Sequence, residues 1–393
     1  MGKILKYIQD TGGGKYQCYT TKKFSLDANN ENETFEIDDK QRSVSRKSDF
    51  AETDQSRRKT VPLNNLLKAK NILPIFRYFL DGSRHTYKVD DISIGGKIFP
   101  IVAGQIIVGC CERQNRDTFK KYDVQRRFVI SLPDDFDDND GKENFCRSYC
   151  NGLNEELNKL SFVRERQFTI DKLMLYKTDR IDHNNDKDNY NSRAVAKIQN
   201  EMVDEEQLLV AQLCRQNKLD DDSWLIKDGS IEYNPRFSNL GLDTTQWNNL
   251  RANYQRVVGV SKTFDPELLK DYLGNGLAQT IADLNPFERT KVYKYDSTHS
   301  GSAFAVWYLR LRDSNFRETQ FSDIIKCEMV LMREGHLIDT DLINEISANL
   351  IREAYPVCFG TDTRWANHLY PVYLTEKFCK SHYLDSSVIL SLF

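Results

Sequence analysis

Two stretches, FRYFLDGS at residues 76–83 and WLIKDGS at residues 224–230, each place the tripeptide Asp-Gly-Ser after a short apolar run. Such runs predict buried or half-buried strands, and Gly supplies the positive φ of a following turn. One Asp-Gly turn alone is common and indicates no function. Two copies, at Asp81 and Asp228, favour a shared site where the strands end. Carboxylates brought together repel each other, and a hard divalent cation is their natural partner.

The composition is typical of a globular protein. The 393 residues are 39% hydrophobic and 29% charged, which allows two domains or one large domain with insertions. The net charge of −3 argues against coating nucleic acid through bulk charge, but it leaves room for a local basic channel. No apolar stretch approaches the roughly 18 residues of a membrane span, and the N-terminus lacks an apolar signal core. We therefore expect a cytoplasmic protein that does not contact a membrane.

The nine cysteines are odd in number and scattered, without the spacing of a zinc site or of a disulfide framework. We interpret them as reduced thiols, in agreement with a cytoplasmic location.

The order of expected elements predicts an α/β (mixed α+β) protein with a mixed sheet flanked by helices. Residues 1–60 are polar and predict a solvated N-terminal arm. Residues 112–192 resemble an insertion between strands. Further strands are expected at 98–103, 105–109, 256–262, 303–311 and 323–331, and helices at 61–72, 193–217, 266–273, 342–354 and 371–384.

The helix expected at 193–217 carries Glu206 near the centre of its apolar face, with Glu201 and Glu205 to one side. A carboxylate in an apolar stripe is costly unless it is paired with a cation. The sequence leaves two alternatives open, a buried salt bridge to Lys or Arg and a metal ligand. His382 lies on the last expected helix, where a lone histidine is usually structural or exposed.

The order of these features resembles the NurA nucleases over roughly residues 70–393. The matching pieces are the two DGS strands, the helix with Glu206, the strand that ends before Lys262, the strand pair at 303–331 and the closing stretch from Tyr370 to His382. The resemblance implies that residues 61–393 form a NurA-like nuclease domain with an RNase H-like core and an insertion at about 112–192. It also implies a homodimer that works with a HerA-type hexameric ATPase on DNA, in end processing or in defence against phage.

The same resemblance implies roles for individual residues. Asp81, Glu206 and Asp228 would be metal-binding carboxylates, His382 would bind metal or move a proton, and Lys262 would contact the scissile phosphate. Phosphodiester hydrolysis with two Mn²⁺ or Mg²⁺ ions fits these residue types. Glu201 and Glu205 remain alternatives to Glu206. Two other functions stay open: a catalytically inactive scaffold subunit of an ATPase complex, and an RNase H-like enzyme that acts on RNA or on RNA/DNA hybrids.

Overall fold

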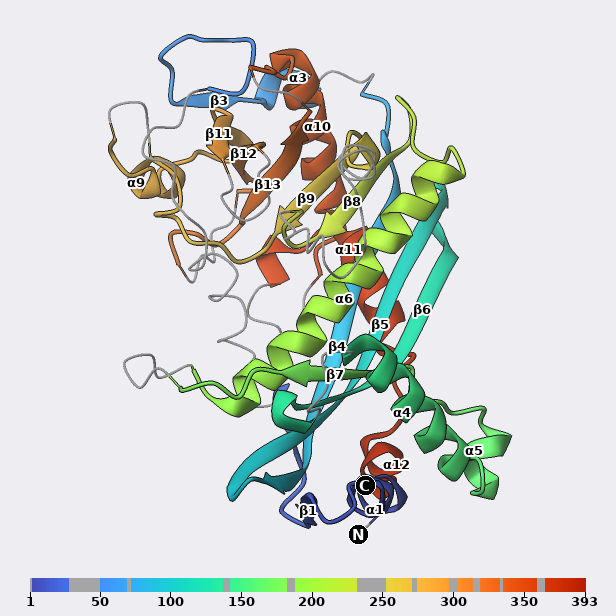
Figure 1. The fold of residues 1–393 in the computed structure, drawn as a ribbon. Coiled ribbons are helices and arrows are strands. Elements are labelled where there is room, and N and C mark those ends of the chain that lie inside the picture. Colours follow the sequence, from blue (N-terminus) through green and yellow to red (C-terminus); the bar gives the residue numbers. More distant parts are fainter. Residues whose placement is uncertain are drawn as a thin grey trace.

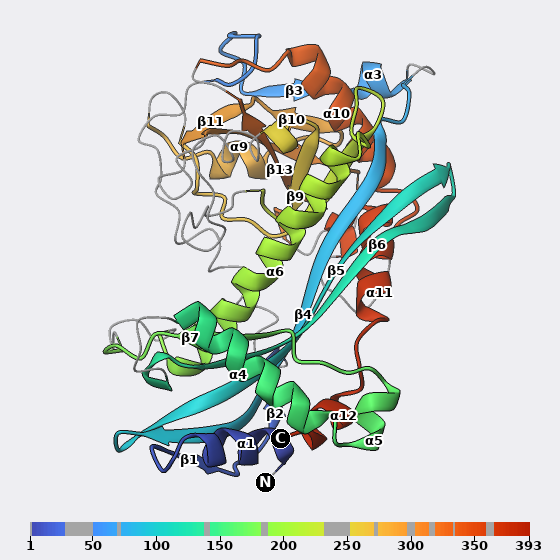
Figure 2. The same cartoon turned by 45° about the vertical axis from the view of Figure 1, so that its right-hand side comes forward.

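The computed structural model describes residues 2–27, 50–68, 72–136, 142–181, 188–231, 252–270, 274–296, 303–313, 319–332, 335–358 and 365–393. In this part of the chain one mixed sheet of 13 strands forms the centre of the molecule, and helices cover both of its faces (Figure 1, Figure 2). The predicted fold class, a mixed sheet flanked by helices, is confirmed. No helix within the described ranges is long and apolar enough to cross a membrane.

Three long strands dominate the sheet: β4 (Phe76–Ile94), β5 (Lys97–Asn115) and β6 (Thr118–Pro133). They pair antiparallel as a meander and link the upper and lower halves of the molecule (Figure 1). The two strands expected at 98–103 and 105–109 are one strand. Gly104 stays within the ladder, and its missing side chain makes room for Ile198, which would lie 2.9 Å from an added Cβ.

Shorter strands extend the meander on both sides. On one side β8 (Trp224–Asp228) pairs parallel to the first part of β4, and β9 (Val257–Ser261) pairs parallel to β8. Next come β13 (Ile324–Leu331) and β12 (Ala303–Arg310), both antiparallel, and then β10 (Glu288–Thr290), β11 (Tyr293–Asp296) and β3 (Thr60–Pro62). On the other side β7 (Lys172–Tyr176) pairs parallel to β6.

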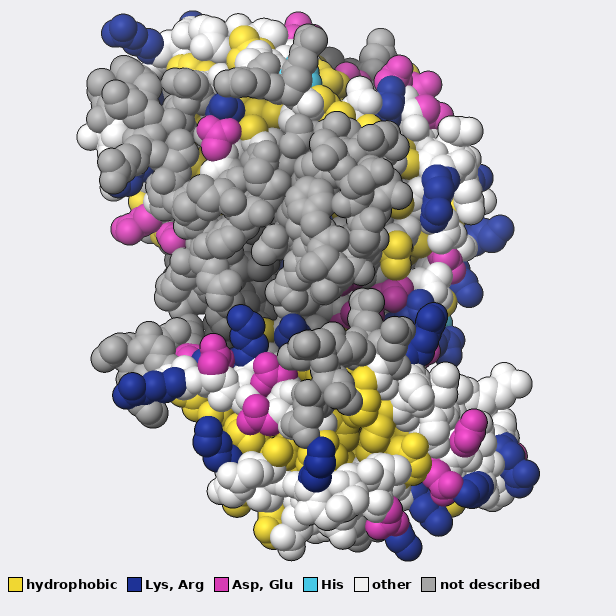
Figure 3. Space-filling view, viewed as in Figure 1, with side chains coloured by type: hydrophobic (Ala, Val, Ile, Leu, Met, Phe, Trp, Pro, Cys, Tyr) yellow, Lys and Arg dark blue, Asp and Glu magenta, His cyan; other side chains and the backbone are white. Residues whose placement is uncertain are grey.

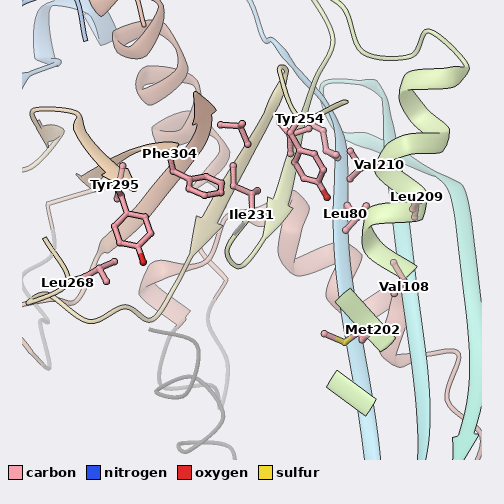
Figure 4. Close-up of a cluster of buried hydrophobic side chains, with 14 of the residues drawn as sticks. Leu80, Val108, Met202, Leu209, Val210, Ile231, Tyr254, Leu268, Tyr295 and Phe304 are labelled. Atoms are coloured by element: carbon pink, nitrogen blue, oxygen red, sulfur yellow. The ribbon is translucent and has the colours of Figure 1, made fainter. Parts of the chain in front are cut away.

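One face of the sheet is covered by α6 (Tyr190–Arg215), the long helix expected at 193–217. Its side chains Met202, Leu209 and Val210 pack toward Leu80 of β4 and Val108 of β5 (Figure 4). The apolar positions recur at helical spacing, so their burial holds the helix across the strands.

The opposite face is covered by α10 (Thr340–Glu353) and α11 (Tyr370–Lys380). Here Leu350 of α10 and Val372 of α11 share a buried cluster with Phe79 of β4 and Ile226 of β8. Successive side chains of a strand point to opposite faces, so Leu80 faces α6 and Phe79 faces α10 and α11. The predicted last helix ends at Lys380 rather than at 384. The backbone N–H groups of His382 and Tyr383 donate three residues back instead of four, and that of Leu384 donates to the Gln105 side chain of β5.

The prediction that residues 1–60 form a solvated arm is wrong for residues 2–27 and 50–52, whereas Thr53 and residues 55–59 are exposed. The helix α1 (Lys3–Thr11) buries Ile4, Leu5 and Ile8, and the strands β1 (Tyr16–Tyr19) and β2 (Phe24–Ser25) pair with β4. Further along, Glu52 is fully buried against Arg289. Composition alone suggested an arm because it does not show which polar groups are paired inside the fold.

The range 112–192 does not stand apart from the sheet, since it supplies β6 and β7. It also contains η2 (Asp134–Phe136), α4 (Lys142–Leu157) and α5 (Ser161–Glu165), which lie at the lower end of the molecule near α1 and α12 (Ser386–Ser391) (Figure 2). Within the described ranges the remaining short helices are α3 (Asn64–Lys68), α9 (Ala278–Ala282) and η3 (Trp365–Asn367).

The helix expected at 266–273 is wrong over residues 266–270, and residues 271–273 lie outside the described ranges. The Asp265 side chain accepts a hydrogen bond from the backbone N–H of Glu267, and this local bond closes a turn that competes with a helix. Leu268 and Leu269 are both buried, whereas adjacent residues of a surface helix point in different directions and are seldom both buried.

Candidate metal centre

Asp81 and Asp228 lie side by side because β4 and β8 are neighbouring parallel strands. The register pairs Phe79 with Ile226 and Leu80 with Lys227, so the next positions are the two aspartates. Strand alternation puts both on the face of Phe79 and Ile226, which is the face covered by α11.

Two glycines establish which face Asp81 points to. A Cβ added at Gly82 would lie 2.3 Å from Oε1 of Glu206 on α6, whereas a Cβ at Gly109 would lie 2.6 Å from Sγ of Cys379 on α11. Gly109 pairs with Asp81 across the β4–β5 ladder, so the two share a face. Asp81 therefore faces α11, and its neighbour Gly82 faces α6.

The two DGS copies differ in structure. Gly229 has φ of +79° and turns the chain away after Asp228, as the sequence predicts. Asp81, in contrast, lies within β4, and the prediction that it ends a strand is wrong. Gly82 is needed there for the close approach of α6. The two aspartates meet where β8 leaves β4.

A third carboxylate, Glu376, joins the two aspartates from α11. One oxygen from each of Asp81, Asp228 and Glu376 lies within 4.8 Å of the others. Asp81 is 5% exposed, and the other two are half-buried. Glu376 was not predicted from the sequence, although it shares the inward side of α11 with Val372, Thr375 and Cys379. A carboxylate beside a buried stripe is the signal that drew attention to Glu206.

Lys262 supplies a positive charge to this cluster. Its Nζ lies 2.8 Å from Oδ2 of Asp228 and 3.3 Å from Oε2 of Glu376. Burial alone lowers the pKa of Lys262, but the charges of the two carboxylates outweigh it and the pKa is raised. Likewise burial raises the pKa of Glu376, but Lys262 and Lys380 outweigh it and bring this pKa down to about 2.

Asp81 is the carboxylate whose charge is least compensated. Burial raises the pKa of Asp81 well above its ordinary value, and the charge of Asp228 raises it further, while Lys262 lowers it. Its Oδ2 atom is buried without a hydrogen-bond partner in the described part of the chain. A buried carboxylate oxygen in this state fits a bound cation, and a set of three carboxylates fits a hard divalent ion such as Mg²⁺ or Mn²⁺.

The glutamates of α6 are placed differently. Glu206 is 3% exposed and forms an ion pair of 2.7 Å with Lys227, on the α6 face of the sheet and so across the sheet from the carboxylate cluster. Glu201 pairs with Lys172 at 2.5 Å and Glu205 with Arg127 at 2.8 Å. Of the two alternatives that the sequence left open for Glu206, the structure shows the buried salt bridge.

His382 follows α11 and is not part of the cluster. Its Nδ1 lies 2.8 Å from the backbone oxygen of Phe378, and its ring packs edge-on against that of Phe378. The histidine next to the cluster is His368, which is 1% exposed and has its Nδ1 4.0 Å from Oε2 of Glu376. Of the five predicted site residues, the structure thus brings together Asp81, Asp228 and Lys262.

The thiols around the site are buried. Sγ of Cys379 lies 3.5 Å from the backbone oxygen of Asp81, and burial raises its pKa strongly. None of the nine cysteines, all of which the structure describes, is in a disulfide bond. We therefore assign Cys379 a packing role beside Asp81.

No protein-family model matches the chain, and no curated protein matches it. Among solved structures, the crystal structure of the NurA nuclease from Sulfolobus solfataricus is similar, with a TM-score of 0.39 and 12% identity, over 81% of this chain and 86% of that chain. A likeness at this level carries no argument about function, so the candidate site stands on its own geometry.

Proposed function

We propose that this chain is a metal-dependent nuclease that hydrolyses phosphodiester bonds of DNA. The observation that carries the proposal is the meeting of Asp81, Asp228 and Glu376 within 4.8 Å, with one buried carboxylate oxygen unsatisfied. Lys262 and Lys380 offset part of the negative charge of this cluster, and the remaining charge favours a bound cation.

We propose the following roles for the residues of the site. Asp81, Asp228 and Glu376 would hold Mg²⁺ or Mn²⁺, which when bound acidifies water and offsets negative charge on a phosphate. Lys262 would turn its ammonium from the carboxylates to a non-bridging phosphate oxygen, as a point charge. The sheet and α11 exclude water from Asp81, which strengthens each of these electrostatic interactions.

The three carboxylates account for one cation site. The two-ion mechanism expected from the sequence needs ligands for a second ion, and the proposed ligands Glu206 and His382 are engaged elsewhere. We therefore propose that one ion is held by this cluster. A second ion would need ligands from the substrate, or from residues outside the described ranges.

DNA as substrate, a homodimer and a HerA-type hexameric ATPase partner are proposals that rest on the resemblance in sequence. A role in DNA end processing or in antiviral defence rests on the same ground. On the α6 face, basic and acidic side chains are interspersed where described residues are visible (Figure 3). The candidate centre lies on the other side of the sheet, so this face gives no indication of a nucleic-acid path.

The test is cleavage of linear double-stranded and single-stranded DNA with Mn²⁺ or Mg²⁺, together with RNA and RNA/DNA hybrid as competing substrates. Asp81→Asn, Asp228→Asn and Glu376→Gln are each expected to lose at least about 100-fold in rate, since loss of even an outer-shell group costs 10–100-fold. The matched control is Asp90→Asn, a buried aspartate on the same strand that accepts a hydrogen bond from Thr21.

Full activity in the Asp81 and Asp228 variants would end the proposal. Preference for RNA or hybrid would move the function to the RNase H-like alternative. Metal binding without cleavage of any of these substrates would favour the scaffold subunit.

A further inference from the structure

A buried asparagine, Asn367, lies at the end of η3, three residues before α11 begins. It is 9% exposed, and its side-chain amide is fully engaged. Nδ2 donates to the backbone oxygens of Lys262 and Ile324, both at 2.9 Å, and Oδ1 accepts from the backbone N–H of Asp323 at 2.8 Å. Because two partners are carbonyls and one is an N–H, only one orientation of the amide satisfies all three.

The amide joins β9 and β13 at the point where the two strands part. Their ladder pairs Gly259 with Glu328 and ends at Ser261, opposite Lys326. Lys262 comes directly after this last pair, so the sheet no longer holds its backbone. The Asn367 amide bridges the two strands there, in place of further ladder bonds.

The partner strand needs the same support. Asp323 has φ of +66°, a left-handed conformation that is uncommon outside Gly, Asn and Asp. Its N–H is the donor that Asn367 accepts, so the amide also fixes the start of β13 in this conformation.

The same short segment also reaches the third carboxylate. His368 follows Asn367 and approaches Glu376 from the interior, and α11 then carries Glu376 to the cluster. Residues 367–368 therefore connect the two chain segments whose side chains meet at the 3.3 Å contact between Lys262 and Glu376.

We propose that Asn367 is a positioning residue for Lys262: its amide fixes the Lys262 backbone so that the ammonium stays between Asp228 and Glu376, within reach of a bound phosphate. This inference rests on the proposed function and adds a residue that the sequence analysis did not single out. It assigns Asn367 no contact with substrate or metal.

The experiment is a double-mutant cycle on DNA cleavage by the full chain in Mn²⁺. Asn367→Asp keeps the shape and the acceptor but removes both donated hydrogen bonds. It is expected to lower kcat about 10–100-fold, as loss of an outer-shell group does, and to leave Mn²⁺ binding by calorimetry within about threefold of wild type. In a Lys262→Met background the same change is expected to have little further effect, because the lysine that it positions is gone.

A merely structural role predicts a different result, namely that Asn367→Asp lowers kcat by the same factor with or without Lys262. That outcome, or an unchanged kcat in Asn367→Asp, overturns the inference. Asn349→Asp is the matched control, since Asn349 is also buried but donates to Glu345 within α10, and it is expected to keep wild-type kcat. Should Asn367→Asp not fold, Asn367→Ser removes the same two donors from Nδ2 without adding charge.

A second cycle needs no catalysis. The unfolding free energy in urea with EDTA is measured for wild type, Asn367→Ser, Lys262→Met and the double variant. Non-additive losses support positioning, and additive losses overturn it. If wild type neither binds Mn²⁺ nor cleaves DNA, the proposed function fails while this cycle still decides whether Asn367 holds Lys262 in its ion pairs.

Discussion

Asp81→Asn is expected to stabilise the metal-free protein while removing its response to metal. The carboxylate oxygens of Asp81, Asp228 and Glu376 lie within 4.8 Å of one another. At an effective dielectric constant of 20, two unit charges at that distance repel by about 3 kcal/mol. Asp81 faces two such neighbours, and Lys262 offsets roughly one of them. Protonation of Asp81 relieves part of the repulsion that remains. Asp81→Asn is therefore expected to add about 1–3 kcal/mol to the free energy of unfolding.

The assay is urea unfolding of EDTA-treated protein at pH 7.5, with and without Mn²⁺. A cation that binds only the folded state stabilises it by about 2.7 kcal/mol at 100 times its Kd. Wild type and the control Asp90→Asn are expected to show this gain, and Asp81→Asn is expected to show little of it. The reasoning is refuted if Asp81→Asn destabilises the metal-free protein, or if it keeps the full gain from Mn²⁺.

Three further predictions concern residues of β4 and α6. Gly82→Ala places a Cβ 2.3 Å from Glu206 Oε1 and is expected to cost about 1–3 kcal/mol in urea unfolding; an unchanged midpoint would show that α6 moves freely away from β4. Glu206→Gln leaves Lys227 buried without its ion pair and is expected to lower the free energy of unfolding by about 3–5 kcal/mol. The variant is expected to keep the stabilisation by Mn²⁺, and loss of that stabilisation would show that Glu206 is a metal ligand. Burial lowers the pKa of His85 below 6.5, although Asp27 opposes this, so the unfolded chain binds the proton more tightly and stability falls as pH drops below about 6.5. His85→Gln is expected to flatten the loss of unfolding free energy between pH 7.5 and 5.5, and an unchanged slope would assign the loss to other groups.

The balance between stability and function follows from the same geometry. Three carboxylates stand against Lys262 and the half-exposed Lys380, which pairs with Glu376, so this partly buried cluster keeps an excess of one negative charge that a protein selected for stability alone would not keep. This excess is what makes the cluster able to bind a cation. Variants that neutralise one carboxylate are therefore expected to separate stability from metal binding.

The sequence by itself determined the strands that carry the aspartates and the long helix between them. Apolar runs before each DGS predicted β4 and β8, and the 3.6-residue periodicity predicted α6. Local pattern was sufficient here because each element buries a regular set of apolar side chains. Even so, the structural role of the glycine differs between the two DGS copies, since Gly229 makes a turn and Gly82 makes room for a helix.

Only the tertiary structure decided which acidic side chains share a site with Asp81. Glu206 and Glu376 give similar signals, a carboxylate on the buried side of a helix, but α6 and α11 lie on opposite faces of the sheet. Strand alternation fixes that Asp81 and Gly82 point to opposite sides, but it does not say which helix covers which side. That choice depends on packing between segments far apart in the sequence, where close contact of Cys379 with Gly109, 270 positions away, and of Glu206 with Gly82, 124 positions away, sets the layers.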